Sequence, residues 1–167
     1  MTIFSVADLC DENQEIQIAQ PIFKLFGKKH SFCGKIKTVK VLDDNSLVKK
    51  LLDEKVDGDV MVIDGAGSLN CSLVGDNLAK KASNNGWAGF VINGCIRDSE
   101  IINNMPIGIK AINTCPKKSV NNDQGTLGER LEFADIFFEE GMYLYSDYDG
   151  LIVSEKNLLK NKWLRIL

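Results

Sequence analysis

The stretch Val60-Met61-Val62-Ile63-Asp64-Gly65-Ala66-Gly67-Ser68 decides the fold of this chain. Its first four residues are apolar without alternation, which is typical of a strand buried on both faces of a sheet. A second run of this kind, Gly89-Phe90-Val91-Ile92-Asn93, ends at Gly94. The segment between the two runs has helical character over 73–82, and Gly86 is well placed to stop it. We therefore predict two parallel strands joined by a helix that crosses back over one face of the sheet.

The segments on either side extend this unit into one α/β domain, predicted to span residues 1–167. In chain order, the expected flanking elements are a helix over 5–12 capped by Ser5, a strand over 31–42, a helix over 47–55, a helix over 99–104 and a strand over 107–112. The final third is predicted to be rich in strands, over 136–138, 142–145 and 150–153, followed by a helix over 155–167.

Composition limits the classes of function. The 167 residues carry 20 Lys and Arg against 23 Asp and Glu, a formal charge of −3, which argues against a direct grip on nucleic acid. No apolar stretch approaches the length of a membrane span, and the N-terminus lacks the pattern of a signal peptide. The five cysteines form no C-x-x-C pair, so we expect free thiols and a cytoplasmic location.

The predicted crossover brings polar residues to one edge of the sheet. The first strand runs up to Asp64, and the helix begins near Gly75 at that same edge. The second strand climbs back to it and is followed at once by Arg97 and Asp98. We therefore expect Asp76, at the start of the helix, to face Arg97 and Asp98.

These residues form a candidate site for an acidic substrate. A helix N-terminus offers free backbone N–H groups that suit a carboxylate, here those of Gly75, Asp76, Asn77 and Leu78. Arg97 can hold a carboxylate or stabilise a developing enolate oxygen. Asp98 is a hard oxygen ligand for Mg²⁺ or Mn²⁺, and Asp76 is a second ligand or orients a metal-bound water.

Each residue also has a purely structural interpretation. Asp98 is in place to cap the helix that follows it, and Asp76 is in place to complement its own helix dipole. Arg97 fits an ordinary ion pair at the surface. Spacing alone does not separate these interpretations from the functional ones.

Three further features are weaker candidates for chemistry. Gly65-Ala66-Gly67 follows a strand, but Asn70 stands where a dinucleotide-binding loop has its third glycine. His30 is the only histidine and lies among lysines, which favours a solvated side chain. Ser68 has no histidine placed beside it by the sequence, which argues against a serine hydrolase.

Several motifs, in order, resemble one known family. Asp76 followed after 20 residues by Arg97-Asp98 matches the D-x20-R-D signature of class II pyruvate aldolases that cleave 4-hydroxy-4-methyl-2-oxoglutarate. The same family contains the regulator of ribonuclease activity A, RraA. The resemblance covers nearly the whole chain and includes Asp8-Leu9-Cys10-Asp11, Phe32-Cys33-Gly34, residues 62–68, residues 93–98 and residues 145–150.

The resemblance implies an α/β/α sandwich related to the swivelling β/β/α domain, assembled as a homotrimer or a dimer of trimers. It places the active site between subunits. The backbone amides of 75–78 would bind the pyruvoyl carboxylate, and Arg97 would bind substrate and stabilise the enolate. Asp98 would ligate the divalent metal, with Asp76 acting through metal-bound waters. The implied activities are aldol cleavage to pyruvate and decarboxylation of oxaloacetate.

The chain departs from the aldolase signature at one position. The signature continues R-D-x-x-E/D, and here Ile101 stands at its last position, with an acid one place earlier at Glu100. Asp147 and Asp149 are further candidate carboxylates, although a turn before Gly150 explains them equally. A non-catalytic regulator that binds and inhibits an RNase E-like endonuclease, and a metabolite-binding scaffold with a vestigial site, remain the alternatives.

Overall fold

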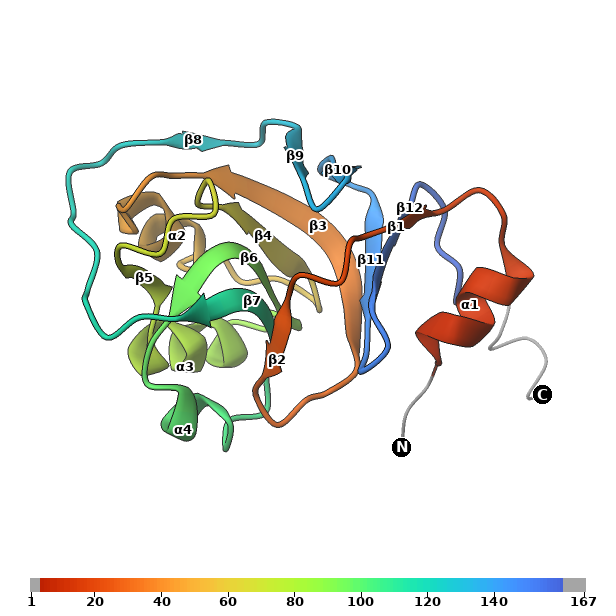
Figure 1. Ribbon diagram of the computed structural model, residues 1–167, viewed down its shortest axis with the longest axis horizontal. Helices are drawn as coiled ribbons and strands as arrows, with labels where there is room; N and C mark the ends of the chain where they lie inside the picture. Colours follow the sequence, from red (N-terminus) through yellow and green to blue (C-terminus); the bar gives the residue numbers. More distant parts are fainter. Residues whose placement is uncertain (1–3, 161–167) are drawn as a thin grey trace.

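A computed structural model describes residues 4–160 (Figure 1). Ten of its strands form one curled sheet, with β1-β12-β11-β3-β4-β6-β7-β2 as the main order, while β5 pairs with β6 and β8 with β3. The strands are β1 (Gln17–Ile18), β2 (Lys24–Phe26), β3 (Phe32–Lys40), β4 (Val60–Asp64), β5 (Ser72–Val74), β6 (Gly89–Ile96), β7 (Gly108–Thr114), β8 (Thr126–Leu127), β9 (Leu131–Phe133), β10 (Ile136–Phe138), β11 (Tyr143–Ser146) and β12 (Leu151–Ser154). The helices are α1 (Val6–Glu12), α2 (Ser46–Leu51), α3 (Asp76–Asn84) and α4 (Ser99–Ile102).

The two buried runs of the sequence are adjacent parallel strands at the centre of this sheet. The register of β4 and β6 pairs Val60 with Gly89 and Asp64 with Asn93. β3 lies parallel to β4 on one side, and β7 lies parallel to β6 on the other. The predicted parallel unit is therefore confirmed, with α3 as its crossover helix.

Alternating side chains of these strands build a core on each face of the sheet. On β4, Met61 and Ile63 pack with side chains of α2, α3 and α4. Val60 and Val62 point the other way, toward the small β9–β10 sheet. The layers are thus helices, a curled sheet and a β-hairpin, which confirms the α/β class and its relation to the β/β/α arrangement.

Helix α1 lies at the other end of the molecule from α3 (Figure 1). Its residues Val6 and Leu9 pack with Tyr145 and Ile152 in a separate cluster. Ser5 caps it as predicted, because its hydroxyl accepts the backbone N–H of Asp8.

Some predicted elements are wrong in extent or kind. Residues 72–74 form β5 beside β6, so α3 begins only at Asp76, with Gly75 as its N-cap. β6 continues past Gly94 to Ile96. α2 ends at Leu51 instead of continuing to 55. The strands β1, β2, β8 and β9 were not predicted, since two or three residues carry no periodicity.

The expected C-terminal helix is absent from 155–160, and its remainder lies outside the described residues. The backbone N–H groups of Leu158 and Leu159 donate instead to Tyr145 Oη and Asn157 Oδ1. Local side-chain acceptors therefore compete with helical hydrogen bonding here.

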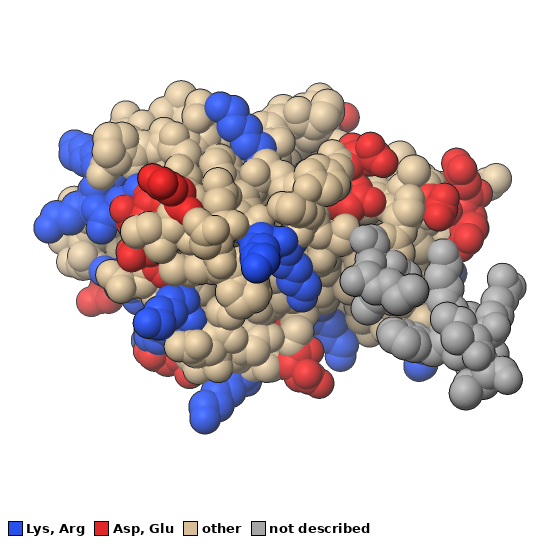
Figure 2. Space-filling view, turned by 90° about the horizontal axis from the view of Figure 1, so that it is seen from below, with Lys and Arg blue, Asp and Glu red and all other residues tan. Residues whose placement is uncertain are grey.

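All five cysteines are free thiols, as expected. Within the described part of the chain, none of the helices has the length and apolarity needed to cross a membrane. Basic and acidic side chains are interspersed on the face shown in Figure 2.

Candidate active site

The start of α3 and the end of β6 meet around Gly75. A Cβ atom at Gly75 would lie 2.8 Å from Asp98 Oδ2 and 3.2 Å from Arg97 Nε. The backbone N–H of Arg97 donates to Val74 O at 3.0 Å, which fixes the approach of the two segments. The structure thus brings together Asp76, Arg97 and Asp98, as the predicted topology required.

Asp98 directs its side chain to α3 and not to the helix that follows it. Its Oδ2 accepts the Asp76 backbone N–H at 3.3 Å and lies 3.5 Å from Arg97 Nε. Asp98 occupies the N-cap position of α4, but its side chain makes no capping hydrogen bond there. Its φ of 56° is in the left-handed region, which Asp tolerates better than most residues. The side-chain capping interpretation of Asp98 is therefore wrong.

The first turn of α3 already holds negatively charged oxygens. The N–H of Asp76 donates to the Asp98 carboxylate, and the N–H of Asn77 donates to Asp76 Oδ1 at 2.8 Å. These are the interactions expected of a helix N-terminus, where unpaired donors and the helix dipole favour anions. The same turn is chemically suited to a substrate carboxylate.

A cavity of about 200 Å³ opens at this turn. Five predicted site residues line it, namely Gly75, Asp76, Asn77, Leu78 and Arg97. Six residues that the sequence did not single out complete its wall: Asn45, Lys49, Ser72, Lys118, Ser119 and Asn121.

Three of these six residues, Lys118, Ser119 and Asn121, belong to the segment 117–121, which we call the 117–121 strap. The backbone N–H of Ser72 donates to Lys117 O at 2.8 Å, and its hydroxyl reaches the same oxygen at 3.1 Å. At the other end, the N–H of Val120 donates to Asp43 O at 3.0 Å. These bonds hold Lys118 and Ser119 at the cavity.

The strap side of the cavity is cationic and polar. It carries Lys118, which is exposed, and Lys49, whose amine donates to Asn121 Oδ1. Ser119 is 6% exposed, and its hydroxyl has no hydrogen-bond partner among the described residues. Together with Arg97, these lysines give the cavity three cationic side chains, which suits a ligand with two carboxylates.

The donor set at Asp98 fits a hard divalent cation. Within residues 4–160, no three His, Cys, Asp or Glu side chains are grouped as a metal site. Mg²⁺ is commonly held by one or two carboxylates and completes its shell with water and substrate oxygens, whereas structural Zn²⁺ requires four protein ligands. Asp98, whose carboxylate contacts the backbone of Asp76, offers oxygen donors of the kind that Mg²⁺ and Mn²⁺ prefer.

The weaker candidates have structural roles. His30 is exposed, and its Nδ1 shares a hydrogen bond with Tyr148 Oη. Asp147 accepts the N–H groups of Asp149 and Gly150 and so forms the turn before β12.

Ser68 and Cys71 lie beside Asp43, away from any histidine. The hydroxyl of Ser68 donates to Asp43 Oδ1 at 2.6 Å. Burial and the nearby Asp43 carboxylate raise the pKa of the Cys71 thiol to about 11. This thiol therefore stays protonated at neutral pH and is a poor nucleophile.

The fold and the site define a class, an α/β protein with an anion-binding helix start facing an Arg-Asp pair. Residues 6–153 match the RraA-like family, described as Aldolase/RraA. The chain belongs to this family.

Its relatives and structural neighbours carry different names. A protein of Aromatoleum aromaticum, "Putative 4-hydroxy-4-methyl-2-oxoglutarate aldolase", is 43% identical over 157 residues, which cover 93% of this chain and 99% of the relative. One of Arabidopsis thaliana, with the same name and the number 3, is 40% identical over 164 residues, covering 95% and 99%.

Two solved structures share the fold closely. One is titled as the RNA-processing inhibitor RraA from Thermus thermophilis; it has a TM-score of 0.89 and 37% identity, with 92% of this chain and 93% of that chain covered. The other is titled as an S-adenosylmethionine: 2-dimethylmenaquinone methyltransferase from Geobacillus kaustophilus, with a TM-score of 0.92, 45% identity, and coverage of 93% and 98%.

Proposed function

We propose that this chain is a divalent-metal-dependent lyase of the pyruvate-aldolase type, which cleaves 4-hydroxy-4-methyl-2-oxoglutarate to pyruvate and decarboxylates oxaloacetate. The observation that carries the proposal is the cavity lined jointly by the N-terminus of α3, Arg97 and two lysines. Both substrates are 2-oxo acids with a second carboxylate, and the cavity combines the N-terminal turn of a helix with three cationic side chains, those of Lys49, Arg97 and Lys118.

The substrate orientation follows from these donors. The carboxylate next to the oxo group binds at the N-terminal turn of α3, residues 75–78, where the helix dipole favours an anion, and this places the oxo oxygen beside Arg97. The second carboxylate then points toward Lys118 and Lys49, which line the same cavity. Asp98 orients Arg97 through the contact of its Oδ2 with Nε.

Both reactions pass through the enolate of pyruvate. In the aldol cleavage, the C4 hydroxyl loses its proton, the C3–C4 bond breaks, and C4 leaves as the carbonyl carbon of one pyruvate. In the decarboxylation, the bond to the distal carboxylate breaks and CO₂ leaves. In each case the electron pair of the broken bond forms the enolate, and a proton returns to C3. Arg97 stabilises the negative oxygen of this enolate.

A divalent cation bound at Asp98, with Asp76 acting through water, would add a Lewis acid at the oxo group. Mg²⁺ and Mn²⁺ are the cations that fit these oxygen donors. The residues of the chain hold the substrate and the enolate charge in either reaction.

Oxaloacetate consumption by the purified protein tests the proposal. Turnover is expected with Mg²⁺ or Mn²⁺ and is expected to stop with chelator and in Arg97→Ala. Arg130→Ala is the matched control, because Arg130 pairs with Glu132 and Glu139 on the β9–β10 hairpin. Oxaloacetate consumption no faster than with the metal ion alone would contradict the enzyme proposal.

The alternative proposal is a regulator that binds and inhibits an RNase E-like endonuclease. It is supported by the likeness to the structure titled as an RNA-processing inhibitor. Capture of the endonuclease by this chain, unchanged in Asp98→Ala, would favour it, and absence of a complex at micromolar concentration would count against it. A sizing measurement beside it tests the proposed homotrimer or dimer of trimers.

A further inference from the structure

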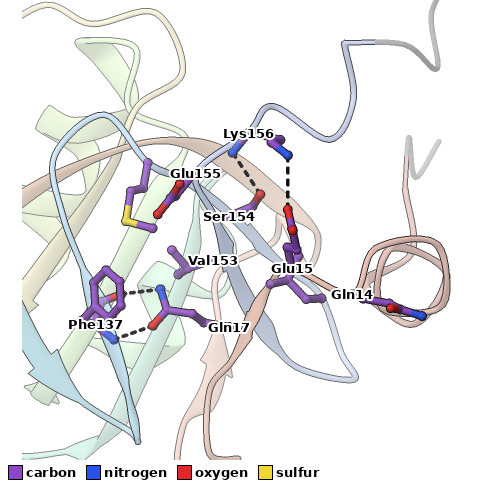
Figure 3. A pocket seen from close by; sticks show the side chains of 10 residues that line it. Gln14, Glu15, Gln17, Phe137, Val153, Ser154, Glu155 and Lys156 are labelled. Atoms are coloured by element: carbon purple, nitrogen blue, oxygen red, sulfur yellow. Dashed lines mark hydrogen bonds and ion pairs between the residues drawn. The ribbon is translucent and has the colours of Figure 1, made fainter.

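The cavities outside the candidate active site differ in whether their polar groups are paired. The hollow in Figure 3, of about 400 Å³, lies beside β1 and β12. Gln17 bonds both the N–H and the carbonyl of Phe137, and Lys156 pairs with Glu15 (Figure 3). These groups satisfy one another and leave little for a ligand to complete.

A second cavity, of about 370 Å³, has a different construction. It lies between α1, the connection from β1 to β2, and the turn from β11 to β12. Its walls are largely apolar and include Val6, Ala7, Ile18, Pro21, Phe23 and Leu151. Lys110 also lines it and stands on β7, between β6 and β2.

Lys110 is a buried lysine whose amine is not held by a hydrogen bond or ion pair among the described residues. It is 5% exposed, and no hydrogen bond or ion pair within residues 4–160 reaches its amine. In this part of the chain, the side-chain nitrogen and oxygen atoms that are buried from solvent and lack a hydrogen bond belong to Asn45, Ser119 and Ser146. Because Lys110 Nζ is not among them, its amine opens into the cavity.

Lysine is almost never buried unless it is paired, since an uncompensated charge loses its hydration. Burial lowers the pKa of Lys110, while the carboxylates of Asp147 and Asp149 raise it in part. The carboxylate of Asp147 is already engaged by the N–H groups of Val6, Asp149 and Gly150. Asp149 also lines this cavity, but neither its carboxylate nor that of Asp147 forms an ion pair with Lys110 in the part of the chain that the structure describes, so the amine has no acceptor at contact distance there.

We propose that this cavity binds a small carboxylate with a branched aliphatic body. The carboxylate accepts a hydrogen bond from Lys110 Nζ, and the aliphatic part packs against Val6, Pro21 and Phe23. The site is separate from the candidate active site, because Lys110 projects from the face of β7 opposite Ile109 and Ala111, which pack with the helices. It does not depend on the proposed lyase activity.

The test uses 3-methylbutanoate as the probe, with calorimetric titration of the full-length protein. We expect saturable binding at one site per chain. The neutral 3-methylbutanamide and the cationic 3-methylbutylamine are expected to bind at least about tenfold more weakly, because a charge-assisted hydrogen bond is lost. Lys110→Met should weaken binding of the acid by a similar factor.

Two controls separate the site from general effects. Lys24→Met, on the neighbouring strand β2, changes an exposed lysine and should leave affinity unchanged. Arg97→Ala should also leave it unchanged, so that failure of the lyase proposal cannot mimic failure here. Lys110→Met should fold, since an apolar chain of similar length replaces an unpaired charge.

The proposal is overturned if the acid and its amide bind the wild-type protein equally, or if neither binds at millimolar concentration. The comparison of the two probes needs only the wild-type protein, so it decides the matter even if Lys110→Met does not fold. Equal affinity of a folded Lys110→Met for the acid would also overturn it.

Discussion

The Asp98 carboxylate accepts a hydrogen bond from the backbone N–H of Asp76 at 3.3 Å. This contact ties the residue two positions past the end of β6 to the first turn of α3, the helix that precedes β6 in the chain. It makes the position of the carboxylate dependent on the helix start and sets the geometry of the candidate active site.

The charge of Asp98 is the first quantity to test. Asp98→Asn keeps the size of the side chain and tolerates the same φ, but removes the anionic ligand. We expect metal-dependent oxaloacetate turnover to fall by about a hundredfold or more. Glu100→Gln, two residues along and exposed, is the matched control and should retain activity. Similar kcat values for the two variants across a Mg²⁺ titration would contradict the assigned role.

Gly75 allows the side chains of Arg97 and Asp98 to approach the start of α3 closely. Gly75→Ala would place a methyl group 2.8 Å from Asp98 Oδ2 and 3.2 Å from Arg97 Nε. Its φ of −120° is open to any residue, so the substitution displaces side chains without straining the backbone. We expect turnover to drop by about tenfold or more, with circular dichroism unchanged. Gly150→Ala, where a Cβ meets nothing within 4 Å, should behave as wild type in the same assay.

Lys118 tests the proposed contact with the second carboxylate. Lys118→Met removes the charge from the strap side of the cavity and should raise the KM for oxaloacetate about tenfold, with a smaller effect on kcat. Lys117→Met is its control, because Lys117 contributes its backbone carbonyl to Ser72 and its side chain does not line the cavity. Steady-state kinetics of both variants provide the measurement, and an equal KM in the two would argue against the contact.

From the buried hydroxyl of Tyr145 we predict a loss of folding stability in alkaline solution. Burial raises the pKa of its hydroxyl from 10.0 to about 12. The folded state therefore retains this proton between pH 10 and 12 while the unfolded state releases it, so the stabilisation is complete below pH 10 and is lost through about pH 12. We expect the free energy of unfolding to fall more steeply over this interval in wild type than in Tyr145→Phe. Denaturant titrations at several pH values measure the difference, and parallel pH profiles would refute the assignment.

The part of the site predicted from sequence is the part fixed by regular structure. The apolar runs at 60–63 and 89–93 specify adjacent strands, and a short crossover then places Asp76 opposite Arg97 and Asp98. The family resemblance adds roles to those residues. Neither inference depends on knowing the conformation of a loop.

The residues that sequence reasoning missed depend on tertiary contacts. Lys118 and Ser119 reach the cavity only because Ser72 and Asp43 bind the strap's backbone at both ends. The Lys117-Lys118 pair was visible in the sequence, but nothing local distinguishes it from solvated lysines. Likewise, Leu73 and Val74 extend the helical pattern of the sequence, and it is pairing with β6 that makes them a strand.

The left-handed backbone of Asp98 limits which residues can replace it. Asn and Gly adopt that conformation readily, whereas most other side chains would be strained there. The substitutions of Asp98 that preserve the fold, to Asn or Gly, are therefore also those that remove the carboxylate. In evolution, a chain of this architecture can lose the Asp98 carboxylate in a single substitution and persist as a well-folded protein.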